Sequence, residues 1–146
     1  MSLATDSIFV TALKANAELM GLVSNRLYST TIAMPDKDLN NAPIPYIIVM
    51  FEGLNNDVTT KDDEMESDTD VVNVSVEVAT KSRKALSELT KEVRQTIYNY
   101  LRREDTAIED YQFSAERVNY DQTKPCYWQV LNYRCDVING INDEQD

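Results

Sequence analysis

The sequence of 146 residues contains no histidine, only three glycines and only two cysteines. Without histidine the usual general base is missing, and Ser-His-Asp or Cys-His nucleophilic arrangements cannot be built. Gly21, Gly53 and Gly140 form neither a Walker loop nor a dinucleotide fingerprint. The spacing of Cys126 and Cys135 is not a zinc-ligand pattern. The sequence therefore predicts a protein that is not an enzyme, with no catalytic residues, no metal site and no cofactor.

Long apolar runs are also lacking. The stretch 47–51 falls far short of the roughly 20 residues that a bilayer-spanning helix requires. The start of the chain places Asp6, Lys14 and Glu18 in a helical pattern, which is not a signal peptide. These features predict a soluble cytoplasmic protein without membrane contact. Its length suits one domain, 1–146, with a core over about 6–138.

Positive charge is scarce, since 14 Lys and Arg face 25 Asp and Glu, for a net charge of −11. Residues 54–70 hold seven acids and one lysine, which we interpret as an acidic loop, and 142–146 hold three acids. The rest of the chain is nearly neutral, and 81–103 carries seven bases against two acids. An overall acidic chain is a poor general nucleic-acid binder, because phosphates repel it. We expect the last residues, 141–146, to be disordered or loosely held.

The hydrophobic pattern predicts two helices. Thr5 or Asp6 can cap a first helix that ends near Met20, with Gly21 as a left-handed C-cap. Ser82 can cap a second helix that runs to about Arg103. Its apolar stripe comprises Leu86, Leu89, Val93, Ile97 and Tyr100, and its lysines project away from that stripe.

Strand patterns lie between and after these helices. A short extended piece over 25–29 precedes a proline-rich loop, 33–45, and a compact strand, 46–52. Valines alternate with polar residues over 72–78, which is typical of a half-buried strand. Two more strands, 112–120 and 127–138, are separated by a turn. The fold class predicted is α+β, a mainly antiparallel sheet of about four strands with two helices on one face.

The charged segments have several interpretations. The acidic loop can bind a metal, face a partner or extend into solvent, although its spacing does not fit an EF-hand. The basic helix face is either solvated or in contact with the acidic loop of a neighbouring copy, which is a head-to-tail arrangement that can close into a ring. The candidate interface residues are Asp57, Asp62, Asp63, Glu64, Glu66, Asp68, Lys84, Lys91, Arg94 and Arg102.

The order of the elements is similar to that of a known group. Short stretches that carry the similarity are LVSNRLY (22–28), PIPYIIV (43–49) and YWQVLNYR (127–134), together with the valine-alternating strand and the helix after it. The chain resembles, over about 8–138, the tail-completion and tail-terminator proteins of long-tailed bacteriophages and prophages. The segment 54–70 and the tail after Ile138 depart from that pattern.

The resemblance implies a structural role without enzymatic activity. Members of this group are small head-tail joining proteins, commonly hexameric rings, that cap the tail tube and present a surface to the head connector. The implied partners are further copies of the chain, the tail-tube protein and the connector protein. The implied location is the virion, at the head-tail junction, with the bacterial host cytoplasm before assembly. An acidic lining would let DNA pass through such a ring without sticking, so the acidic loop has a channel-lining interpretation too.

Two other functions remain as alternatives. One is an acidic DNA mimic that inhibits a DNA-binding protein, although such mimics spread their acids over a whole surface. The other is an α+β domain that binds a small molecule, which a deep pocket with convergent polar groups would favour.

Overall fold

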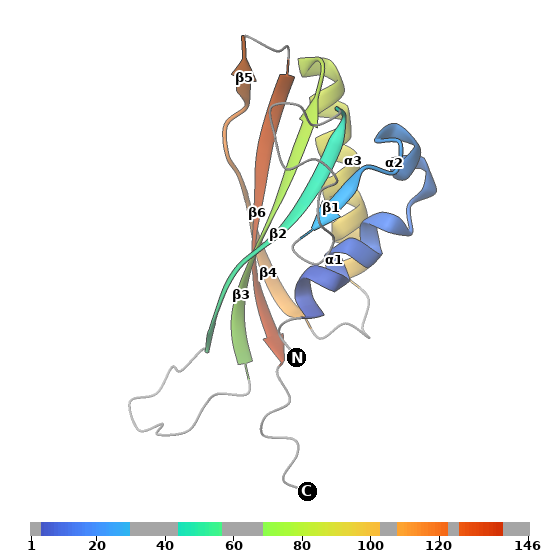
Figure 1. Cartoon of the computed structure of the whole chain (residues 1–146). Helices are drawn as coiled ribbons and strands as arrows, with labels where there is room; N and C mark the ends of the chain where they lie inside the picture. The colour runs from blue at the N-terminus through green and yellow to red at the C-terminus, as the bar shows by residue number, and fades with distance from the viewer. Residues whose placement is uncertain (1–3, 30–43, 57–68, 103–107, 123–125, 139–146) are drawn as a thin grey trace, which may run out of the picture.

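The computed structural model describes residues 4–29, 44–56, 69–102, 108–122 and 126–138. In these ranges the chain forms an α+β fold of three helices and a six-stranded sheet (Figure 1). The α+β class agrees with the sequence, but the expected count of about four strands is wrong. The predicted strand 112–120 is divided into β4 (Ile108–Ala115) and β5 (Asn119–Asp121), and the short piece near residue 25 is a strand, β1 (Leu27–Ser29).

The sheet has the order β1-β2-β3-β6-β4, and β5 also pairs with β6. The central strands are long: β2 (Tyr46–Asn56), β3 (Thr69–Thr80) and β6 (Cys126–Ile138). β1 runs parallel to β2, and every other pairing is antiparallel. β4 and β5 lie along the same side of β6, one beyond the other, so together they form one edge of the sheet (Figure 1).

The first predicted helix is divided in two. α1 (Ala4–Lys14) is followed by α2 (Ala17–Leu22), and Asn16 caps α2 by accepting a hydrogen bond from the Leu19 amide at 3.1 Å. The proposed caps are therefore wrong, because residues 5 and 6 lie within α1 and Gly21 lies within α2. The left-handed turn comes later, at Ser24 and Asn25, with φ of 52° and 61°.

The second helix agrees with its prediction. α3 (Arg83–Leu101) begins after Ser82, whose hydroxyl accepts from the Ala85 amide at 3.1 Å. The apolar stripe is buried, apart from half-buried Tyr100. The stripe packs against valines of β3 and against Leu131 and Val137 of β6 in one continuous core.

All three helices lie on one face of the sheet (Figure 1), so two helices were too few in the prediction. α1 contacts β2, while α3 contacts β3 and β6. Along β6 the residues on the helix side alternate with Trp128, Val130 and Arg134 on the other side. That second side carries no helix of the described residues and is called the open face below.

The expected bounds of the acidic loop need correction. Pairing of Asn56 with Asp70 extends β2 and β3 into it, so the connection spans at most 57–68. Three segments lie outside the described residues: the connection 57–68, most of the predicted loop 33–45 and the tail 141–146. No helix of the described residues is long and apolar enough to cross a membrane.

Candidate functional site

A groove of about 660 Å³ runs between α3 and the β4 edge of the sheet. It exists because α3 covers β3 and β6 but leaves the helix-facing side of β4 uncovered. One wall is the flank of α3 next to its buried stripe, and the floor is aromatic. The lining residues are Arg83, Leu86, Ser87, Thr90, Lys91, Arg94, Gln95, Tyr98, Tyr111, Phe113, Val118, Gln129 and Tyr133.

The groove is positively charged. Arg83, Lys91 and Arg94 line it, and none of the described lining residues is Asp or Glu. The guanidinium carbon of Arg94 lies 4.0 Å from the centre of the Phe113 ring, which is a cation-π contact that holds the charge over the aromatic floor. Cations held without carboxylates beside them attract an anionic partner.

The aromatic floor is packed and uncharged. The Phe113 and Tyr133 ring centres are 5.1 Å apart, and those of Tyr111 and Tyr133 are 5.8 Å apart. Burial raises the pKa of both tyrosines, and the nearby charge of Arg94 offsets this only in part. The phenols therefore stay neutral at physiological pH, and the charge of the groove comes from its cations.

Thr90 adds an unpaired polar atom to the wall of the groove. Its hydroxyl oxygen is buried and has no hydrogen-bond partner among the described residues. A buried hydroxyl without a hydrogen-bond partner lowers the stability of the folded protein by an amount on the order of 1–3 kcal/mol. A ligand or partner that fills the groove can satisfy this atom.

The structure divides the predicted interface residues. Lys91 and Arg94 line the groove, whereas exposed Lys84 on α3 and exposed Arg102, directly after α3, are not among its lining residues. The Arg102 guanidinium carbon lies 5.2 Å from the ring centre of Tyr98. The six acidic candidates, Asp57, Asp62, Asp63, Glu64, Glu66 and Asp68, lie outside the described residues. The sequence did not identify Arg83 or the aromatic floor as part of a site, because the groove depends on how α3 packs over β6 beside β4.

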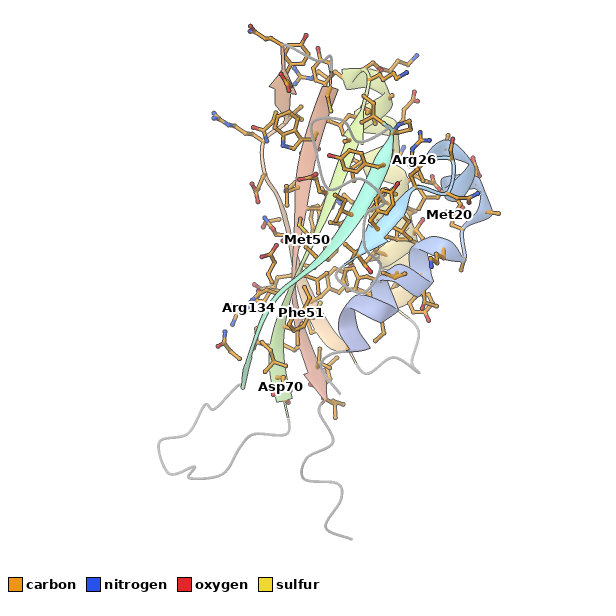
Figure 2. The ribbon with its side chains drawn as sticks, in the orientation of Figure 1. Met20, Arg26, Met50, Phe51, Asp70 and Arg134 are labelled. Carbon is orange, nitrogen blue, oxygen red and sulfur yellow. The ribbon has the colours of Figure 1, made fainter. Side chains whose placement is uncertain are left out.

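A second hollow, of about 650 Å³, lies on the open face. Met50 and Arg134 line it from β2 and β6 (Figure 2). Its middle is a chain of hydrogen bonds that joins β3, β6 and the residue after β4: Ser75 Oγ donates to Asn132 Oδ1 at 2.8 Å, and Asn132 Nδ2 donates to Glu116 Oε2 at 3.0 Å. This part of the open face is therefore held by hydrogen bonds between polar side chains.

The other end of the open face is apolar. Tyr28, Tyr46 and Ala79 are buried there, with Ile48 and Trp128 half-buried against them. The Tyr46 hydroxyl donates to Glu77 Oε2 at 3.0 Å, which orients the ring. Trp128 is therefore packed into a local cluster and is not a free-standing binding platform.

The two cysteines lie on opposite faces of β6. Cys135 is buried in the core, and Cys126 is half-buried on the open face. The thiols are not joined to each other. Burial raises the pKa of Cys135 to about 12, so its thiol stays protonated and unreactive.

The described residues offer surfaces for binding. No group of three or more His, Cys, Asp or Glu that could hold a metal occurs among them. The metal interpretation of the acidic loop concerns residues 57–68, which are not described. The groove provides charge and apolar area together, which are the two components of a specific protein contact.

Comparison with known proteins gives a structural match. A chain from a structure titled "Virion of native gene transfer agent (GTA) particle" superposes with a TM-score of 0.58 at 17% sequence identity. The match covers 91% of this chain and 93% of the other. At this identity the similarity establishes a shared fold. No protein-family model and no curated protein matches the sequence.

Proposed function

We propose that this chain is a structural protein of a phage or phage-like virion. The observation that carries the proposal is the similarity to a chain of a gene transfer agent virion particle, because it spans nearly the whole length of both chains. A match of that extent concerns the complete fold and its element order, not one common motif. It adds to the separate resemblance of the sequence to tail proteins.

Within that class, we propose a protein that completes or terminates the tail and joins it to the head connector. It forms a ring, commonly a hexamer in the group it resembles, and binds the tail tube. This role requires surfaces for other copies and for two further partners. The charged groove beside α3 and the open face offer such surfaces on one domain. The protein acts at the head-tail junction of the virion and is made in the host cytoplasm.

The absence of enzymatic activity belongs to the same proposal. A joining protein works by holding partners together, and it needs no reacting group. The chain contains no histidine, so any acid-base chemistry would fall to carboxylates, tyrosines or thiols.

The groove bears on both alternatives. An acidic DNA mimic presents carboxylates over a continuous surface, whereas α3 presents Arg83, Lys91 and Arg94 along its length. The groove counts against that alternative. Its volume of about 660 Å³ lies within the range of small-molecule sites, so a small-molecule-binding domain keeps one observation in its favour.

Particles made without the protein test the proposal. We expect electron micrographs of such particles to show filled heads and free tails, and light scattering after size exclusion to show a multimer of the purified chain. Particles that join heads to tails normally without the protein would refute the proposed role.

A further inference from the structure

We propose that the groove between α3 and β4 receives the acidic segment 57–68 of a second copy of this chain. This inference rests on the proposed function, since it describes how one subunit of the assembly holds the next. The proposed occupant is a segment of known sequence, and the lining residues of the groove all lie in the described part of the chain.

Charge complementarity is the first argument. The groove carries three cations without a carboxylate among its described lining residues. The segment carries six acids and one lysine, Lys61, for a net charge of −5. Opposite charges across a contact set its register and speed its encounter, and like charges elsewhere reject wrong partners. Of the chain's two acidic segments, this one has the larger charge, since the last five residues carry −3.

The apolar content of the segment is the second argument. Met65 stands between acidic residues in the stretch DDEMESD, 62–68. Methionine sulfur makes favourable contacts with aromatic rings. The floor of the groove offers Tyr111, Phe113 and Tyr133 below the cations. A methionine flanked by carboxylates therefore fits an aromatic floor flanked by cations.

Placement in the fold is the third argument. The segment joins β2 to β3, whereas the groove adjoins β4, and β6 lies between β3 and β4. The two complementary features thus belong to opposite halves of the sheet. A head-to-tail contact that closes into a ring needs this arrangement, because each subunit must present a different surface to each neighbour.

The unpaired Thr90 hydroxyl is the fourth argument. It is buried in the groove wall and has no partner among the described residues. A carboxylate or a backbone carbonyl of a docked segment that reaches this hydroxyl can accept a hydrogen bond from it. This makes Thr90 a neutral position at which docking can be tested apart from charge.

The first experiment measures binding of a labelled peptide with the sequence 57–68 to the full-length chain. We expect Lys91→Glu with Arg94→Glu to weaken binding by at least about tenfold. Lys81→Glu and Lys84→Glu together are the matched control, because they reverse two exposed charges near the start of α3 that are not among the groove-lining residues. A peptide with Met65→Ser should bind several-fold more weakly. Equal binding to the groove variant and the control variant would overturn the inference.

The second experiment mixes two variants and follows their mass by sedimentation velocity. One variant has the reversed groove, Lys91→Glu with Arg94→Glu. The other has a reversed segment, Asp62→Lys, Asp63→Lys and Glu64→Lys. We expect each alone to lose self-association and an equimolar mixture to regain it, since each reversed surface then meets its complement on the other chain.

Failure takes distinct forms. If the segment occupied the groove of its own chain, mixing would restore nothing, and the inference would be wrong. A wild-type chain that never self-associates would also overturn it. If heads and tails fail to join without the protein, yet mixing restores no assembly, the proposed function survives and only this inference fails. Circular dichroism of each variant checks its folding, and the peptide variants require no folding.

Discussion

The two faces of the sheet are held together by different forces. On the helix side, Val72, Val74, Val76 and Val78 of β3 are at most 1% exposed beneath the helices. On the open face the same strand presents smaller or polar residues between them, such as Ser75 and Glu77. The first face is stabilised by the burial of apolar area. The second combines hydrogen bonds between side chains with a smaller apolar cluster around Tyr46 and Trp128. The core that stabilises the fold is therefore concentrated on the helix side.

Neighbouring residues of β6 provide the largest contrast. Leu131 is fully buried among the helices, and Val130 lies half-buried on the open face. We expect Leu131→Ala to lower the free energy of unfolding by about 2–5 kcal/mol, because it leaves a cavity. Val130→Ala should cost about 1 kcal/mol or less. Urea unfolding of both variants measures the difference, and equal costs would show that the faces are not distinct.

Alkaline pH should also act through the buried face. The pKa of Cys135 is raised to about 12, so between pH 9 and 10 the unfolded chain loses this proton while the folded chain keeps it. The contribution of this thiol to the free energy of unfolding is therefore fully present below the pKa that the thiol has in the unfolded chain. It falls as the pH rises above that value, with a slope of up to about 1.4 kcal/mol per pH unit. Cys135→Ala should flatten the slope in that interval, although it lowers stability overall. Unfolding curves at pH 8, 9 and 10 check this, and an unchanged slope would contradict it.

Attachment of the helical layer is a smaller effect. Besides capping α2, Asn16 donates hydrogen bonds to Glu92 Oε1 at 3.0 Å and to Thr96 Oγ1 at 2.9 Å, both on α3. We expect Asn16→Ala to cost about 1–2 kcal/mol by calorimetry. Gln95→Ala is the control, since Gln95 donates a hydrogen bond to exposed Asn99 in its own helix, and it should cost under about 0.5 kcal/mol. Equal destabilisation by the two substitutions would mean that the hydrogen bonds of Asn16 contribute no more to stability than those of an exposed amide.

The hydrogen-bond chain on the open face gives the smallest expected effect. A double-mutant cycle of Ser75→Ala and Asn132→Ala should yield a coupling energy of about 1 kcal/mol, because the two side chains bond at 2.8 Å. Chemical denaturation of the two single variants and the double variant supplies the values. Additive costs would indicate that water replaces this bond without loss.

Periodic patterns predicted the parts of the fold that are decided locally. The alternating valines of β3 and the apolar stripe of α3 each imply one buried face, and both lie in the core. The three-residue strands β1 and β5 are too short to show a period. The break between α1 and α2 interrupts an otherwise continuous helical pattern. It depends on contacts of Asn16 with Glu92 and Thr96, which are far away in sequence.

The candidate site was predicted only in part for the same reason. Exposed cations on α3 follow from helical spacing, and Lys91 and Arg94 do line the groove. Which cations border a groove depends on how much of β4 the helix leaves uncovered, and this is a property of tertiary packing. The sequence also indicated which segment is acidic, but not that Phe113 would lie beneath Arg94.

The edges of the described sheet limit how copies can join. At one edge β1 has only three residues, and at the other the strand is interrupted between β4 and β5 and shifts register near Ile108. Short or irregular edges resist the addition of a further strand. In the proposed assembly, neighbouring copies would therefore be poorly suited to sharing one continuous backbone ladder, and side chains would supply most of the contact. Subunits joined in that way would separate as folded units, and a rise in ionic strength would weaken the charged part of their contact.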